Sequence, residues 1–268
     1  MAGRIRTGIG GWTFPPWRGV FYPDGLRQAD ELAYAASKLG AIEINGTYYS
    51  LQKPASFAAW AAATPDDFVF AIKGSRFCTN RKVLSDAGEA IDRFLGQGLT
   101  ELGPKLGPIL WQFMATKKFD LVDFAGFLAL LPREIGGRPL RHCVEVRNAT
   151  FATEAFVDLA RKQAVAICVS ENPDYPVIAD VTADFVYARL MKGSDEIETC
   201  YADPELGAWA KRFGGYARGE TPADLSPIAS PAPIRDRDVF AFFISAGKLR
   251  APAGAMALAD QLGAPSAT

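Results

Sequence analysis

The stretch that decides the fold is residues 107–147, which reads GPILWQF at 107–113, LVDFAGFLALL at 121–131 and CVEVR at 143–147. The first and third segments are short and almost continuously apolar, which is typical of parallel strands buried on both faces. The segment between them is a strongly apolar helix in our interpretation. Together they predict a strand, a crossover helix and a second parallel strand, the repeating unit of α/β folds.

The same alternation continues in both directions from this stretch. We expect eight strands, at residues 5–12, 41–45, 68–73, 107–113, 143–147, 165–169, 185–190 and 239–244. We expect helices at residues 32–39, 54–63, 86–95, 121–131, 153–162, 204–216 and 253–262. Asp30 and Thr153 are candidate N-caps. Eight such strand positions in a chain of 268 residues predict a closed (β/α)8 barrel of the TIM type.

A doubly wound open sheet is the main alternative to the barrel. It would carry a glycine-rich phosphate loop between a strand and a helix. Residues 8–12 read GIGGW, but two prolines follow them instead of a helix. We therefore interpret residues 1–262 as a single barrel domain and residues 263–268 as a flexible tail. Residues 219–238 are expected to form a long exposed loop.

Composition narrows the function classes. The formal net charge is −1, which argues against a general nucleic-acid coat or a membrane-surface protein. No apolar run of 18 residues is present, so we expect no membrane contact and a cytoplasmic location. The four cysteines form no C-x-x-C pair and predict neither a zinc site nor a disulfide framework.

Polar residues terminate the apolar runs at the ends where TIM barrels carry their chemistry. Glu43 and Asn45 are two residues apart and share one face of their strand, as do Glu145 and Arg147. A charge facing the surrounding helices would be buried away from water at a cost of several kcal/mol. We therefore expect these four side chains to point into the barrel near its mouth.

The predicted mouth carries more cations than acids. Lys73, Arg76, Arg147 and Arg189 outnumber Glu43 and Glu145, and an anionic ligand would relieve the repulsion. We assign catalysis to Glu43, Glu145 and Lys73. Substrate binding is assigned to Trp12, Asn45, Tyr48, Arg76, Gln112, Arg147 and Arg189. Two alternatives remain open: an ion network that only plugs the barrel, and a Trp12 side chain that only packs a loop.

His142 is the only histidine, and it stands at the start of the fifth predicted strand, where we expect a structural role. A zinc or iron site would need several histidine or cysteine ligands. We therefore predict no cofactor, although Glu43 and Glu145 leave Mg²⁺ or Mn²⁺ open. A Ser-His-Asp triad is excluded on the same ground, so acid–base chemistry falls to glutamate or lysine.

A series of motifs across nearly the whole chain resembles the YecE-like family of barrel proteins. The motifs are GGW at 10–12, WRG at 17–19, FYP at 21–23, EINGTYY at 43–49, FVFAIK at 68–73, KLGPILWQ at 105–112, EVR at 145–147 and DFVYAR at 184–189. The resemblance implies a TIM-type barrel with a pocket at the strand ends and no established reaction. Proposals for the family include an endonuclease-like or nucleic-acid-binding role.

The chain departs from the family pattern at several positions. Many members have histidine where Asn80 and Asn148 stand, tryptophan at Phe151, a His-Gly pair at 191–192 and asparagine at Ser245. The resemblance therefore implies that this member lacks several possible metal ligands or proton carriers.

Three functional hypotheses follow. The first is an enzyme, a metal-independent isomerase, lyase or hydrolase, that binds a small phosphorylated or carboxylated substrate at the barrel mouth. The second is a nucleic-acid-binding or endonuclease-like protein. The third is a non-catalytic ligand-binding protein.

Overall fold

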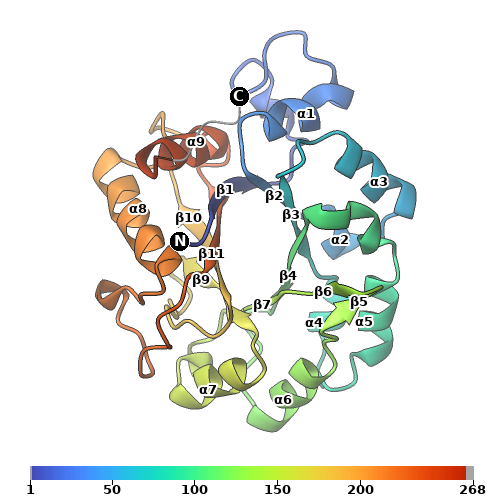
Figure 1. Ribbon diagram of the computed structural model, residues 1–268, viewed down its shortest axis with the longest axis vertical. Helices are drawn as coiled ribbons and strands as arrows, with labels where there is room; N and C mark the ends of the chain where they lie inside the picture. Colours follow the sequence, from blue (N-terminus) through green and yellow to red (C-terminus); the bar gives the residue numbers. More distant parts are fainter. Residues whose placement is uncertain (1, 264–268) are drawn as a thin grey trace.

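The computed structural model describes residues 2–263 and shows parallel strands closed into a barrel inside a ring of helices (Figure 1). The strands of this sheet, in chain order, are β1 (Ile5–Gly10), β2 (Ala41–Ile44), β3 (Val69–Lys73), β4 (Leu106–Gln112), β7 (His142–Glu145), β8 (Ala166–Ile167), β9 (Val169–Glu171), β10 (Phe185–Lys192) and β11 (Asp238–Ala246). Their order around the sheet is β8-β7-β4-β3-β2-β1-β11-β10-β9, and every pairing is parallel. The predicted TIM-type barrel is confirmed.

The barrel closes through a strand that is divided in two. β8 pairs with β7 and β9 pairs with β10, and only Cys168 separates β8 from β9. The Cys168 N–H donates to the Val144 carbonyl oxygen at 2.9 Å, so the chain stays attached to β7 at the break. The sheet therefore has nine strands on eight barrel positions, and the prediction of one continuous strand at residues 165–169 is wrong in this detail.

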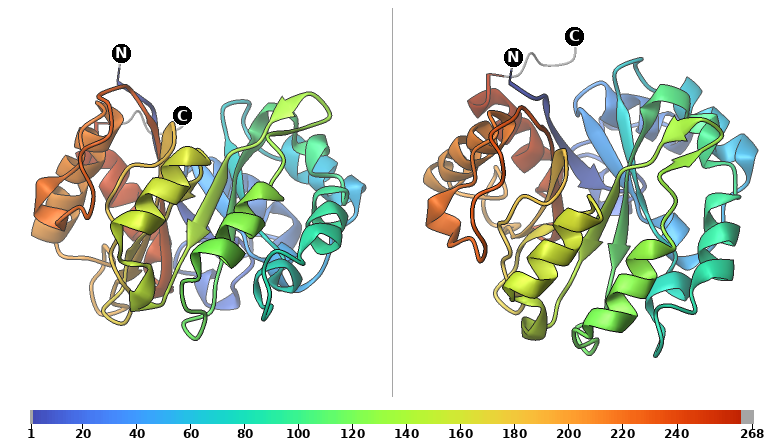
Figure 2. Two further views of the ribbon diagram at one scale, coloured as in Figure 1. Left: turned by 90° about the horizontal axis from the view of Figure 1, so that it is seen from below. Right: turned by 60° about the horizontal axis from the view of Figure 1, so that its bottom comes forward.

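In the described part of the chain, seven longer helices cover the outside of the barrel (Figure 2). They are α1 (Glu31–Ala36), α3 (Pro54–Ala62), α5 (Gly88–Leu95), α6 (Leu121–Ala129), α7 (Glu154–Lys162), α8 (Asp203–Ala217) and α9 (Ala251–Gln261). Thr153 caps α7 as predicted, because its hydroxyl accepts the Phe156 N–H. Asp30 precedes α1, but its carboxylate makes no capping hydrogen bond and instead accepts from Arg27 at 2.7 Å.

Several short elements have no counterpart in the prediction. Most of them have two to four residues, too few to show a period, and the seven-residue 3-10 segment Leu99–Lys105 is kinked at Gly103. These elements are α2 (Gly46–Tyr49), α4 (Arg76–Thr79), the hairpin of β5 (Glu134–Ile135) and β6 (Arg138–Pro139), and the 3-10 turns Pro15–Trp17, Gln28–Asp30, Leu99–Lys105, Ala149–Phe151 and Ala223–Leu225. The helices α2 and α4 follow β2 and β3 directly, so they shape the mouth of the barrel. Within residues 2–263, no helix is long and apolar enough to cross a membrane.

The segment expected to be a long loop at 219–238 is a loop up to Arg237, with one 3-10 turn, and β11 begins at Asp238. Arg237 is buried and anchors it, because its guanidinium donates to the carbonyl oxygens of Gly219 and Pro233 at 3.0 and 2.6 Å. The expected tail at 263–268 lies, apart from Gly263, outside the described residues.

The inward-facing side chains change character along the barrel. On β10, Phe185 and Tyr187 are followed two residues later by Arg189, and on β2, Ala41 is followed by Glu43. Alternate residues share a face, so the apolar and the charged side chains occupy successive layers inside one lumen. The amino-terminal layer is hydrophobic, and the carboxyl-terminal layer is charged.

Candidate functional site

A cavity of about 790 Å³ opens at the carboxyl-terminal ends of the strands. Seven of the predicted site residues line it: Trp12, Asn45, Tyr48, Lys73, Gln112, Arg147 and Arg189. They come from strands and loops spread around the barrel, and the parallel arrangement brings all of these strand ends to one side. The structure therefore gathers most of the predicted residues at one concave surface.

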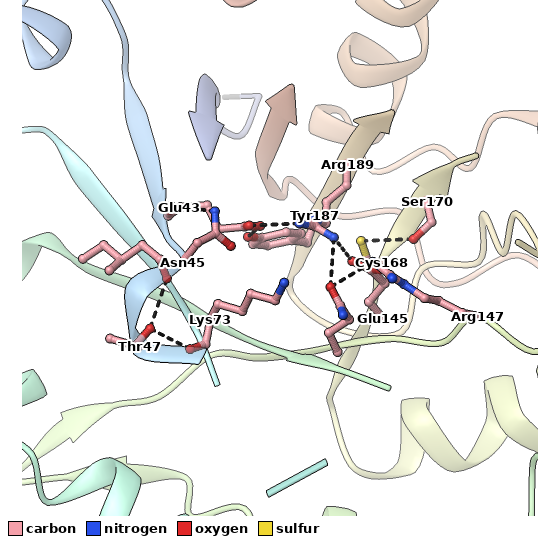
Figure 3. A network of polar contacts seen from close by, with 12 residues as sticks. Glu43, Asn45, Thr47, Lys73, Glu145, Arg147, Cys168, Ser170, Tyr187 and Arg189 are labelled. Carbon is pink, nitrogen blue, oxygen red and sulfur yellow. Dashed lines mark hydrogen bonds and ion pairs between the residues drawn. The ribbon is translucent and has the colours of Figure 1, made fainter. Parts of the chain in front are cut away.

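The centre of the site is a buried arginine held between two carboxylates. Arg189 is 2% exposed, and Glu43 and Glu145 are fully buried. Arg189 Nη2 donates to Glu43 Oε1 at 3.1 Å, and Nη1 donates to Glu145 Oε2 (Figure 3). The Tyr187 hydroxyl donates to Glu43 Oε2 at 2.7 Å. Both oxygens of Glu43 therefore accept hydrogen bonds from the barrel interior.

Arg147 completes the arrangement on the other side. Its Nε donates to Glu145 Oε1 at 2.6 Å, and its Nη2 donates to Gln112 Oε1 at 2.8 Å. Its guanidinium lies 4.6 Å from the centre of the Tyr175 ring. We call Glu43, Glu145, Arg147 and Arg189 the floor network, because the two carboxylates lie beneath the cavity and the two arginines reach its lining.

Two members of the floor network, Glu145 and Arg189, have pKa values shifted in favour of their charged forms. Burial alone would raise the pKa of Glu145, but Arg189 and Arg147 outweigh it and lower that pKa. Burial likewise opposes the charge on Arg189, but Glu145 and Glu43 raise its pKa well above the ordinary value. The network therefore contains two carboxylates and two guanidiniums whose formal charges cancel.

Lys73 lies at the end of β3, and its amino group extends toward the floor network without pairing with it (Figure 3). In the described part of the chain, no ion pair or hydrogen bond joins Lys73 Nζ to an acidic side chain. Nζ instead lies 4.5 Å from the centre of the Tyr48 ring. The Lys73 side chain is 9% exposed, and burial, together with the positive charge of Arg189, lowers its pKa to about 8.

The backbone at Lys73 is held by a neighbouring strand end. The Thr47 hydroxyl is buried, donates to the Lys73 carbonyl oxygen at 2.7 Å and lies 3.1 Å from the Ile44 carbonyl oxygen. This contact ties the end of β3 to the start of α2. The base of the lysine is therefore fixed, while its amino group faces the cavity.

Three predicted residues do not line the cavity. Glu43 and Glu145 lie below it, where all four carboxylate oxygens accept from arginine or tyrosine. Their role as acid or base stays a prediction. Arg76 does not join the group: it is exposed on α4, with its guanidinium 5.4 Å from the Phe77 ring and 5.9 Å from the Tyr49 ring. A helix turn begins directly at Arg76 and directs the chain away from the lumen.

Both alternatives left open by the sequence describe part of the structure. Trp12 packs edge-to-face against Trp60 and Phe70, with ring centres 5.2 and 6.4 Å apart, and also lines the cavity. The floor network is largely self-satisfied, as a structural plug would be. An ion network that only fills the barrel does not explain why the buried charge of Lys73 lies beside it without an acidic partner among the described residues.

Sequence reasoning assigned no site role to three side chains that the structure places at the site. Tyr187 precedes Arg189 by two residues on the same strand, so the period of two placed it on the inward face. Lys248, in the loop after β11, lines the cavity with its amino group 4.2 Å from the centre of the Phe14 ring. Tyr175, which covers Arg147, comes from an irregular connection that carries no periodic signal.

Ser245 is a strained residue at the mouth. It lines the cavity and has a φ of 73°, in the left-handed region that glycine favours. The β10–β11 pairing shifts register between Leu190 and Lys192, opposite this residue.

His142 has a structural environment, away from the mouth. The Trp111 Nε1–H donates to His142 Nδ1 at 3.1 Å, and His142 Nε2 lies 2.8 Å from the Pro132 carbonyl oxygen. Burial lowers the pKa of His142 to about 4. Among residues 2–263, no group of three or more histidine, cysteine or acidic side chains is placed to hold a metal ion.

Comparison with known proteins assigns the family. The family model described as "Protein of unknown function DUF72" matches residues 6–268. The chain belongs to the DUF72 family. It is 28% identical over 148 residues to the UPF0759 protein YecE of Escherichia coli strain K12, a match that covers 55% of this chain and 50% of YecE. The chain thus spans about half the length of the curated relatives it matches, and the YecE-like resemblance is confirmed.

Solved structures share the fold of this DUF72 protein. A DUF72 family protein of Thermotoga maritima is 22% identical with a TM-score of 0.68, covering 97% of this chain and 98% of that one. One from Enterococcus faecalis is 16% identical with a TM-score of 0.71 at the same coverage. A xylose isomerase-like TIM barrel/4-hydroxyphenylpyruvate dioxygenase fusion protein is 14% identical with a TM-score of 0.53, covering 98% of this chain and 44% of that one. At these identities the likeness concerns the fold.

Proposed function

We propose that this DUF72 protein is an enzyme that binds a small phosphorylated or carboxylated substrate at the carboxyl-terminal mouth of its barrel. The observation that carries the proposal is the buried amino group of Lys73, which has no acidic partner among residues 2–263. It lies beside a network whose own formal charges cancel. An unpaired cation facing a cavity lowers the free energy of a bound anion. The cavity volume of about 790 Å³ suits a metabolite-sized ligand.

Two further cations can contact the anion. Arg147 donates from Nε to Glu145 and from Nη2 to Gln112. Within the described residues, its Nη1 makes no hydrogen bond to the protein. Lys248 lines the cavity from the loop after β11, and its amino group lies over the Phe14 ring. Both residues line the same cavity as Lys73, so an anionic group bound by either of them lies in the cavity that the Lys73 amino group faces.

Lys73 is the side chain best suited to proton transfer in this site. A group transfers protons most effectively when its pKa lies near the working pH, and the pKa of Lys73 is about 8. In this arrangement Glu43 and Glu145 hold Arg189 and Arg147 in place, and the protonation changes occur on Lys73. Asn45 and Gln112, which line the same cavity, are placed to orient substrate oxygens.

Thermal unfolding with a panel of anions tests the proposal. Phosphate, sulfate, sugar phosphates and short carboxylic acids are added to the wild-type protein, to Lys73→Gln and to Arg76→Gln. We expect at least one anion to raise the Tm of the wild type and of Arg76→Gln, which changes an exposed arginine outside the cavity. Lys73→Gln should lose most of that rise. If no anion changes the wild-type Tm, the proposal fails.

One surface observation favours nucleic-acid binding as a second candidate. Arg76 lies close to two exposed rings at the rim, Tyr49 at 62% and Phe77 at 61% exposure. Arginines beside exposed aromatic rings bind single-stranded nucleic acid by stacking and by phosphate contact. A gel shift with single-stranded DNA and RNA at low salt checks this candidate. Binding should weaken with salt and with Phe77→Ala, and no shift at low salt would remove it.

A further inference from the structure

We propose that the Lys73 amino group is a nucleophile that forms an imine with the carbonyl group of an anionic aldehyde or ketone. This inference rests on the proposed function, and it narrows the substrate class to carbonyl compounds that carry a carboxylate or phosphate. Three features of the site support it: the placement of the amine, its neighbours, and the anion contacts around it.

The placement of the amine differs from that of a lysine used for charge balance. Glu43 and Glu145 lie close to Lys73, but Arg189 stands between them and takes one oxygen of each. Tyr187 and Arg147 take the remaining oxygens. The carboxylates are therefore bonded to other partners, and the Lys73 amino group is left facing the cavity over the Tyr48 ring.

The neighbours of Lys73 favour the neutral amine, which is the form that attacks a carbonyl. Desolvation and an adjacent cation are the two devices that activate a lysine nucleophile, and burial and Arg189 supply both here. Arg147 acts in the same direction, while Glu43 and Glu145 oppose it. With a pKa of about 8, roughly one Lys73 side chain in ten is neutral at pH 7, against about one in 3,000 for an ordinary lysine.

The chemistry balances without an oxidant or a metal. The amine nitrogen attacks the carbonyl carbon, a C–N bond forms, and the carbonyl oxygen takes up a proton to give a carbinolamine. The C–O bond then breaks, and the hydroxyl leaves with a proton as water, which gives the imine. A protonated imine withdraws electrons from the neighbouring carbon, so of the three reaction classes the site favours a lyase or an isomerase.

Other cations of the same cavity are available to the anionic group of such a substrate. Arg147 and Lys248 line the cavity with Lys73, and the floor network uses only Nε and Nη2 of Arg147, so a carboxylate or phosphate can bind in the cavity that the Lys73 amino group faces. Lys73 adds its positive charge to this anion site, and in its neutral form it is also the group that reacts. The two lysines of the cavity thus have different tasks.

Reductive trapping tests the inference. The full chain is incubated with pyruvate or with glycolaldehyde phosphate and sodium cyanoborohydride, which reduces an imine to a stable secondary amine, and peptides are mapped by mass spectrometry. We expect an adduct on the Lys73 peptide that exceeds the adduct on the peptide of the exposed Lys211 by at least about tenfold near pH 7. Its rate should rise with pH through about 8.

Two variants separate this inference from the proposed function. Lys73→Arg keeps the positive charge and removes the nucleophile, so it should keep the Tm rise with pyruvate and lose the adduct. Lys211→Met is the matched surface control and should keep both. A pyruvate-induced Tm rise without an adduct on Lys73, or adducts spread equally over exposed lysines, overturns the imine and leaves the anion site standing. If no anion shifts the Tm and no adduct forms, both proposals fall.

Discussion

The two ends of the barrel use similar residues in opposite ways. At the amino-terminal end, the rings of Phe185 and Phe240 are buried, and the Arg141 guanidinium lies 5.7 and 4.9 Å from their centres. Arg141 pairs there with Asp238 at 3.3 Å, with both side chains about a third exposed. At the mouth, the equivalent layer consists of Glu43, Glu145 and Arg189, which are buried beneath a cavity.

The two ends of the barrel differ in how much hydration their charged side chains lose. Charges over an aromatic plug keep contact with water, so their pairing contributes little to stability. Charges inside the lumen lose their hydration and depend on one another. A barrel can be filled with apolar side chains, as the amino-terminal end demonstrates, so filling the lumen does not by itself require a charged layer. The function proposed for the mouth supplies a reason for it.

Removing the central arginine should have the largest effect. Arg189→Met leaves Glu43 and Glu145 buried without their shared partner, and we expect a loss of about 3–5 kcal/mol in the free energy of unfolding. Urea denaturation at pH 7 measures it. Arg141→Met, at the amino-terminal end of the barrel, should lower the free energy of unfolding by no more than about 1 kcal/mol. Equal losses for the two variants would contradict the comparison.

Acid should destabilise the protein through His142, which lies at the amino-terminal end of strand β7. The unfolded chain protonates this histidine near pH 6.5, whereas the folded chain does so only near pH 4. The unfolded state therefore binds more protons between these values, and stability falls as the pH drops from 6.5 to 4 by about 3 kcal/mol. His142→Gln should lose this component in urea titrations at several pH values. An unchanged pH profile would argue against it.

Replacing the unpaired lysine should stabilise the mouth. Below pH 8, the wild type holds a charged Lys73 in a buried site. Lys73→Met should therefore raise the free energy of unfolding by about 1–3 kcal/mol at pH 7. Between pH 8 and 10.5 the unfolded state binds more protons than the folded state, so wild-type stability rises and the gain should shrink. Thermal and urea unfolding at pH 7 and 10 check both statements, with Lys211→Met as the control. A destabilised variant at pH 7 would mean that the lysine has a structural role.

The smallest effect concerns the backbone at the rim. Ser245 is exposed with a φ of 73°, a conformation that costs a residue with a Cβ about 1 kcal/mol more than glycine. Ser245→Gly should therefore raise the free energy of unfolding by about 1 kcal/mol or slightly less. Ser245→Ala keeps the Cβ atom, so its free energy of unfolding should not rise above that of the wild type. A destabilising glycine would show that the serine hydroxyl contributes to the fold.

Much of the fold was predictable because its signals are local. Apolar runs such as residues 107–113 and the cap at Thr153 depend on neighbours along the chain, and the structure confirms them. The alternation of side chains in a strand also placed Glu145 and Arg147 together at the mouth. The break at Cys168 and the turn that removes Arg76 from the site escaped prediction, because short irregular segments have no period.

By itself, the sequence determined a TIM-type barrel and the identity of the polar residues at its strand ends. It could count four cations against two acids, but it could not pair them. Only the tertiary structure decided that Arg189 and Arg147 neutralise Glu43 and Glu145, that Arg76 lies elsewhere, and that Lys73 keeps an unpaired amino group. The physical reason is that ion pairing depends on distances across the lumen, between strands that are far apart in the chain.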